Sequence, residues 1–143
     1  MKHTWIGILP VNEDGAILFG EDKKGIWGIL GGGQEEGESD LTTATRELKE
    51  EAKYEIRDTS KLELVYRGKP ENNDQYCIVY KTKSSNLKEY LGTGIDKDIV
   101  NTDYLSVERI EEIRVKKLFN FKDISILDQI NLEEIIAKAY IQV

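Results

Sequence analysis

The sequence predicts one domain of mixed α/β type (α+β), a sandwich in which helices surround a β-sheet. The chain has 143 residues, which is the length of one domain. Hydrophobic residues make up 39% of it and there are only 2 prolines, which is typical of a folded chain. Apolar segments of strand length alternate with segments of helical periodicity. We therefore expect residues 1–143 to form a single domain.

The first third of the chain predicts three strands and a glycine-rich segment. Residues 4–10 and 16–19 are apolar and flank turn-forming residues at 12–15. Residues 26–30 form a further short apolar run, and we expect the glycines at 31–33 to break regular structure. Eight of the 12 glycines lie between Gly15 and Gly37. This region needs either unusual backbone angles or close backbone approach to another group.

A helix is predicted to begin at Ser39 or Asp40, either of which can cap it, and to end near residue 52. Its apolar residues recur at spacings of three and four and define one buried face. These residues are Leu41, Ala44, Leu48 and Ala52.

The second half predicts strands at residues 62–67, 76–82 and 99–105. Helices are predicted at 107–118, with Ile110, Ile113 and Leu118 inward, and at 123–140. We interpret Trp5 and Trp27 as core residues rather than as surfaces for base stacking.

The charge of the chain excludes several classes of function. The net charge is −7 and no basic run occurs, so binding to extended nucleic acid or to an anionic membrane is not expected. No apolar segment is long enough to span a bilayer, and the N-terminus does not resemble a signal peptide. The only cysteine, Cys77, cannot form an internal disulfide, which favours a cytoplasmic location.

Most of the acidity lies in one segment. Between Gly32 and Glu51 there are seven acidic and two basic residues, so this segment carries −5 of the net charge. On a helix, Glu47, Glu50 and Glu51 lie close together beside the apolar face. A solvated surface helix would also explain an acidic segment. Such a helix is stabilised by opposite charges four residues apart, however, and here Glu47 lies four residues before another acid, Glu51. A divalent cation such as Mg²⁺ or Mn²⁺ would stabilise such a carboxylate cluster.

The glycine run immediately before this helix adds a second feature. Free backbone N–H groups and the positive end of a helix can approach an anion there, and backbone carbonyls can face a metal. Together the two features predict a site for a metal-bound phosphate, where a metal can activate water for hydrolysis.

This segment resembles the signature of the Nudix hydrolase family, the Nudix box. The box is a glycine, five residues, a glutamate, seven residues, and then Arg-Glu-U-x-Glu-Glu-x-Gly-U, where U is a bulky apolar residue. The match runs from Gly32 through Glu38 to Tyr54, and it departs at Lys53, where the family has glycine. A glycine there would end the helix in a left-handed conformation, so this departure concerns the helix end.

The resemblance implies an α/β/α sandwich with a mixed sheet and hydrolysis of a nucleoside diphosphate linked to another moiety. It implies that Mg²⁺ or Mn²⁺ is bound by Glu47, Glu50, Glu51 and the Gly31 carbonyl, and that Arg46 holds the glutamates. Glu47, Glu50 and Arg46 are the implied catalytic residues, with Glu47 the first choice for general base. Gly32, Gly33 and Glu38 are assigned to the substrate-binding part of the box. A further acid from outside the box is expected among Asp96, Asp98 and Asp103.

Two other functions are compatible with the sequence. One is a catalytically weak nucleotide-binding or regulatory domain on the same fold, and the other is an acidic α/β domain whose helix is purely structural. The partner we expect is a small nucleotide: a nucleoside triphosphate, an oxidised nucleotide, ADP-ribose or a dinucleoside polyphosphate. Many relatives form dimers, so a homodimer is also compatible.

Overall fold

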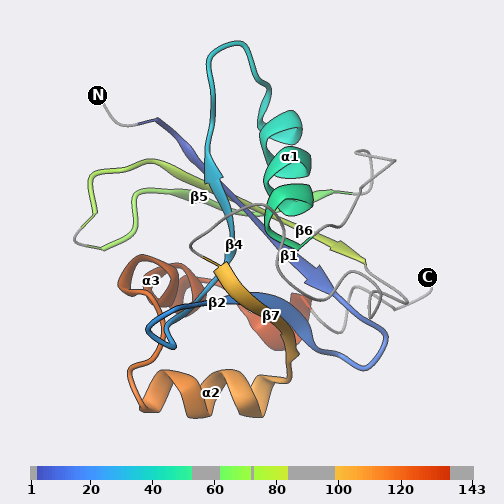
Figure 1. The fold of residues 1–143 in the computed structure, drawn as a ribbon, viewed down its shortest axis with the longest axis vertical. Helices are drawn as coiled ribbons and strands as arrows, with labels where there is room; N and C mark the ends of the chain where they lie inside the picture. The colour runs from blue at the N-terminus through green and yellow to red at the C-terminus, as the bar shows by residue number, and fades with distance from the viewer. Residues whose placement is uncertain (1–2, 53–61, 72, 84–98, 136–143) are drawn as a thin grey trace.

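The computed structural model describes residues 3–52, 62–71, 73–83 and 99–135 (Figure 1). These residues form one mixed sheet of seven strands, ordered β3-β2-β1-β6-β5, with β4 paired to β1 and β7 paired to β2. β1 and β6 are parallel, and the other pairs are antiparallel. The strands are β1 (Trp5–Val11), β2 (Ile17–Asp22), β3 (Trp27–Gly28), β4 (Leu30–Gly33), β5 (Glu63–Gly68), β6 (Cys77–Lys83) and β7 (Ile99–Leu105).

Strand β1 shows why helices cover both faces of this sheet. All its residues are buried, and alternate side chains enter two different cores. Ile6 and Ile8 join the core formed with the helix α1 (Asp40–Ala52). Leu9 and Val11 join the core formed with α2 (Val107–Val115) and α3 (Phe121–Gln129). The predicted sandwich is confirmed, as Figure 1 shows with α1 apart from α2 and α3.

The helix predicted at 40–52 is observed with those bounds as α1. Ala44, Leu48 and Ala52 of its predicted apolar face are fully buried, and Leu41 packs partly buried against the same core. Trp5 and Trp27 are buried in the opposite core, as predicted.

The expectation that residues 31–33 break regular structure is wrong. They belong to β4, which pairs antiparallel with β1 in the register Ile6↔Gly32. The reason for glycine here is close approach rather than unusual backbone angles, because no residue of β4 has a positive φ. A Cβ on Gly31 would lie only 2.2 Å from the backbone oxygen of Ile6.

Both C-terminal helices are shorter than predicted. The helix predicted at 107–118 ends at Val115, because Lys117 takes a left-handed conformation with φ 59°. Leu118, predicted to face inward, is 37% exposed, and its carbonyl accepts the Trp27 N–H instead.

A single helix over 123–140 is also wrong. α3 ends at Gln129, since Ile130 is extended and Asn131 then caps a new helical turn by accepting the Glu134 N–H. The last residues of that prediction lie outside the described residues. None of the described helices is long and apolar enough to cross a membrane.

Candidate functional site

Helix α1 and the glycine strand β4 meet at one edge of the sheet. Among the described strands β4 pairs only with β1, so its outer edge is free for side chains. There the Gly31 N–H donates to Oε1 of Glu51 at 2.5 Å, and the Gly33 carbonyl accepts from Nη2 of Arg46 at 3.1 Å. Two side chains of α1 therefore occupy backbone groups that another strand would otherwise use.

Arg46 connects the acidic residues of the site. Its Nε and Nη2 donate to the two carboxylate oxygens of Glu38, at 2.7 and 3.0 Å. Its Nη1 donates to Oε1 of Glu47 at 2.9 Å and lies 3.3 Å from Oε2 of Glu50. The guanidinium lowers the pKa of Glu38 to about 2, and Glu38 in turn raises the pKa of Arg46. Glu38, Glu47 and Glu50 are thus held around one cation.

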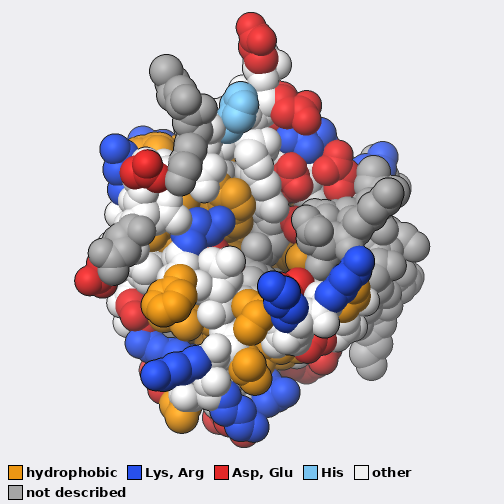
Figure 2. All heavy atoms as spheres, turned by 60° about the vertical axis from the view of Figure 1, so that its left-hand side comes forward, with side chains coloured by type: hydrophobic (Ala, Val, Ile, Leu, Met, Phe, Trp, Pro, Cys, Tyr) orange, Lys and Arg blue, Asp and Glu red, His pale blue; other side chains and the backbone are white. Residues whose placement is uncertain are grey.

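Glu47 and Glu51 are unusual among carboxylates because both are buried, with 8% and 4% of their surface exposed. The Glu47 carboxylate lies against Gly32, where an added Cβ would come within 2.3 Å of it. Gly32 is therefore required for the position of Glu47. On the face drawn in Figure 2, acidic side chains gather at the top of the molecule beside a cluster of basic atoms.

The chemistry of this donor set fits a hard divalent cation, since every side-chain donor is a carboxylate oxygen. In the arrangement of the described residues, however, no three Asp, Glu, His or Cys side chains converge as metal ligands. Arg46 lies between Glu47 and Glu50, and the Gly31 N–H binds Glu51. To bind a metal, the glutamates would therefore have to give up their hydrogen bonds to Arg46 and to the Gly31 N–H.

Of the three acids predicted from outside the box, only Asp103 belongs to the described residues, and it is not brought to this cluster. Asp103 is exposed on β7 opposite Phe19, and its carboxylate accepts the N–H of the next residue, Tyr104. Asp96 and Asp98 lie outside the described residues, as do Lys53 and Tyr54 at the end of the box.

One buried acid was not singled out by the sequence. Asp123, in the first turn of α3, is 4% exposed, and its Oδ2 accepts the Ile29 N–H at 3.0 Å. Ile29 immediately precedes β4, so this carboxylate approaches the same strand from the other face of the sheet. An acidic residue in the first turn of a helix is common, so nothing in the sequence distinguished Asp123.

With this geometry in place, comparison with known proteins gives consistent results. Residues 1–129 match the NUDIX domain family. A methanol dehydrogenase activator from Bacillus methanolicus is 26% identical over 136 residues, which cover 90% of this chain and 72% of that protein.

Two solved structures illustrate the likeness of the fold. An Ap4A hydrolase from C. elegans matches with a TM-score of 0.67 and 16% identity, covering 94% of this chain and 99% of that one. A bifunctional NMN adenylyltransferase/ADP ribose pyrophosphatase from Francisella tularensis matches with a TM-score of 0.73 and 16% identity. In that case the match covers 95% of this chain and 42% of the other.

Proposed function

The chain belongs to the Nudix hydrolase family, and from that premise we propose that it is a divalent-metal-dependent pyrophosphohydrolase of a nucleotide or nucleotide derivative. The observation that carries the proposal is the pair of buried glutamates, Glu47 and Glu51, beside Glu50 on one side of α1. Burying carboxylates is costly unless they are paired or bind a metal. Here Glu47 shares a single arginine, Arg46, with Glu38 and Glu50, and Glu51 accepts the Gly31 N–H.

In this proposal Glu47, Glu50 and Glu51 bind Mg²⁺ or Mn²⁺. The Gly31 carbonyl is a further ligand, because in a strand it faces the same edge as the Gly31 N–H that binds Glu51. When bound, the cation supplies charge neutralisation on the phosphate oxygens and lowers the pKa of bound water.

The chain's own residues then position the reactants. Arg46 keeps Glu38, Glu47 and Glu50 in place, while Gly32 and Gly33 let the substrate approach the backbone of β4. Glu47 is our first choice for the group that takes the proton from the attacking water. That water attacks one phosphorus and the bond to the bridging oxygen breaks. Asp96 and Asp98 stay candidates for a further acid.

A substrate panel with product identification tests this proposal. The purified chain is incubated with Mg²⁺ and, separately, with a nucleoside triphosphate, an oxidised nucleotide, ADP-ribose and a dinucleoside polyphosphate. We expect hydrolysis of at least one compound at a phosphoanhydride bond, abolished by EDTA and restored by added Mg²⁺ or Mn²⁺. Hydrolysis that survives EDTA would contradict the metal-dependent mechanism.

The alternative is a nucleotide-binding or regulatory domain with weak catalysis. One observation favours this alternative: Arg46 already forms ion pairs with Glu47 and Glu50, two of the proposed metal ligands. Under this alternative the panel would give binding without turnover for every compound. The proposed partner is in either case a small nucleotide, and the buried free thiol of Cys77 is compatible with the cytoplasmic location we propose.

A further inference from the structure

The one histidine of the chain, His3, lies beside the glycine strand. The ladder between β1 and β4 continues past the first residue of β1, because the Gln34 N–H donates to the Thr4 carbonyl at 2.8 Å. His3 therefore runs alongside the end of β4, and its Cβ lies 3.7 Å from the position that a Cβ on Gly33 would take. Its carbonyl accepts from Nε2 of Gln75 at 2.8 Å, which holds its backbone in place.

His3 and Glu47 approach β4 from its two faces. Successive residues of a strand point to opposite faces, and their Cα atoms are about 3.8 Å apart. The Glu47 carboxylate lies where a Cβ on Gly32 would be. His3 lies beside the Cβ position of Gly33, the next residue of the strand. A substrate that crosses the edge of β4 from the glutamates therefore comes to His3.

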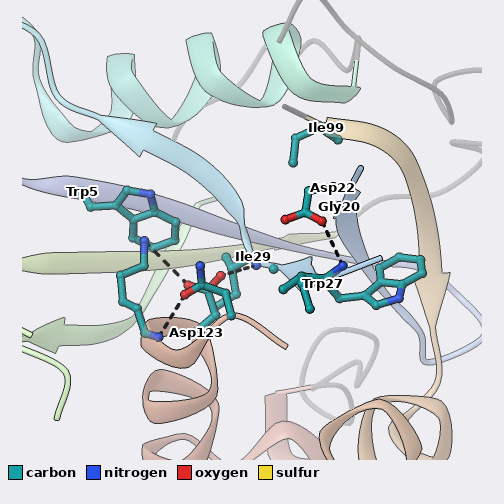
Figure 3. Close-up of a pocket in the computed structure, with 11 residues that line it drawn as sticks. Trp5, Gly20, Asp22, Trp27, Ile29, Ile99 and Asp123 are labelled. Atoms are coloured by element: carbon teal, nitrogen blue, oxygen red, sulfur yellow. Dashed lines mark hydrogen bonds and ion pairs between the residues drawn. The ribbon is translucent and has the colours of Figure 1, made fainter. Parts of the chain in front are cut away.

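Two other cations close to this part of the sheet are already bound to protein groups. Arg46 is held by three glutamates of the site. Nζ of Lys122 lies 3.4 Å from the centroid of the Trp5 ring and 3.8 Å from Oδ1 of Asp123 (Figure 3). The side chain of His3, in contrast, is exposed and forms no hydrogen bond or ion pair with the residues that the structure describes. Its imidazole is therefore free to bind a ligand.

The charge around Gly33 determines which ligand the imidazole fits. The exposed acids Glu35 and Glu36 follow Gly33 after one residue, so a phosphate that extends beyond the metal meets negative charge there. Such a phosphate requires an N–H donor of its own, because hydrogen bonds to charged oxygens are the strong ones. An imidazole supplies at least one N–H donor whether it is neutral or charged. His3 is thus suited to a phosphate oxygen.

We propose that the imidazole of His3 binds a third phosphate of the substrate, beyond the diphosphate that lies at the metal. Glu47, Glu50 and Glu51 hold the metal and with it the diphosphate, the phosphate chain crosses β4 at Gly33, and His3 donates to an oxygen of the next phosphate. The substrate class is then a nucleoside triphosphate or a dinucleoside polyphosphate rather than ADP-ribose, which has only two phosphates. This inference rests on the proposed function for the position of the diphosphate.

The first test observes His3 directly and needs no hydrolysis. Because the chain has one histidine, isotope-labelled histidine gives a single imidazole signal in NMR spectra. Inorganic tripolyphosphate and pyrophosphate are titrated with Mg²⁺ into separate samples, and phosphorus spectra check that the anions stay intact. We expect a saturable shift of the His3 signal with tripolyphosphate that is larger than with pyrophosphate. A signal that moves no more than with sodium chloride of matched ionic strength, or equally with both anions, would overturn the proposal.

The second test measures what His3 contributes to substrate binding. His3→Ala removes the N–H donor, whereas His3→Gln keeps one. With a nucleoside triphosphate as substrate, His3→Ala should raise KM by about 10-fold with a smaller change in kcat, and His3→Gln should recover part of this loss. Circular dichroism checks that both variants fold. A KM of His3→Ala equal to that of the wild type would contradict the role given to His3.

The matched control is Arg109→Ala, which removes an exposed nitrogen donor of α2, at the other end of the molecule from the loop between β4 and α1 (Figure 1). It should leave KM as in the wild type. The two proposals fail separately. A His3 shift with tripolyphosphate in a chain that hydrolyses no compound of the panel would support the His3 site and contradict the proposed function. Hydrolysis of ADP-ribose alone would support the proposed function and contradict the site for a third phosphate.

Discussion

At the scale of single residues, Arg46 is the cation on which the acidic site depends. Its side chain is 25% exposed and pairs with Glu38, Glu47 and Glu50. Removing it leaves Glu47 buried and close to other carboxylates, so Arg46→Ala should lower the free energy of unfolding by about 2–3 kcal/mol. Arg46→Lys keeps the charge but cannot bind Glu38 through two nitrogens, so it should restore stability only in part.

Urea denaturation measures both variants. The matched control is Arg109→Ala, because Arg109 is more exposed and pairs only with Glu112 among the described residues. Its effect should stay below about 0.5 kcal/mol. Equal effects of Arg46→Ala and Arg109→Ala would contradict the role given to Arg46.

From the buried carboxyl of Asp123 we predict an unusual pH dependence of the free energy of unfolding. Burial raises its pKa from 3.8 to about 6, partly opposed by Lys122 and by the Ile29 N–H. Between these two pH values Asp123 keeps its proton in the folded chain but has lost it in the unfolded chain. The free energy of unfolding therefore falls as pH rises through this range. The shift corresponds to about 3 kcal/mol.

The comparison with Asp123→Asn, which does not titrate, isolates this contribution. From about pH 4 to pH 6, the wild type should lose stability relative to the variant in urea denaturation. Below this window the difference between the two should become constant. A difference that is constant across the whole window, or that grows in the opposite direction, would contradict the burial of the carboxylate.

At the scale of elements, the three glycines of β4 have different reasons to be glycine. A Cβ on Gly31 would meet backbone of β1, one on Gly32 would meet the Glu47 carboxylate, and one on Gly33 would meet only His3 at 3.7 Å. Gly31→Ala should therefore destabilise the fold by about 1–3 kcal/mol, and Gly33→Ala by less than about 0.5 kcal/mol.

Gly32→Ala separates stability from function. It should displace Glu47, the end of a flexible side chain, and so reduce hydrolysis more than it reduces stability. Thermal unfolding and hydrolysis assays of the three alanine variants measure this order. Full activity in Gly32→Ala would show that Glu47 does not need its position against the strand.

A second element, the C-terminal helical segment, shows the limit of periodicity as a signal. Ile126, Leu127 and Ile130 fit one apolar face of a continuous helix, yet the chain turns at Ile130. The local hydrogen bonds of Asn131 to the next turn compete with continuation of the helix. Periodicity records which residues are buried and not whether the backbone between them stays helical.

At the scale of the whole molecule, the order of strands and helices was predictable because alternating and helical periodicities are local. The acidic half of the site was predictable for the same reason, since Arg46, Glu47 and Glu50 lie on one helix. The pairing of β4 with β1 was not, because glycines lack the side chains on which strand prediction depends. Asp123 was not predictable either, because its contact with Ile29 joins residues 94 positions apart.

The metal site that we propose for a pyrophosphohydrolase consists of Glu47, Glu50 and Glu51. Glu51→Gln tests it most directly, because glutamine can still accept the Gly31 N–H while losing the charge a divalent cation requires. Glu112→Gln, on the exposed side of α2, is the matched control. With the substrate identified by the panel, Mg²⁺ binding by calorimetry and Mg²⁺-dependent hydrolysis are measured on the same preparations. We expect Glu51→Gln to keep the fold but to weaken both Mg²⁺ binding and hydrolysis by at least about 100-fold, while Glu112→Gln matches the wild type. Wild-type hydrolysis by a folded Glu51→Gln would contradict the proposed metal site.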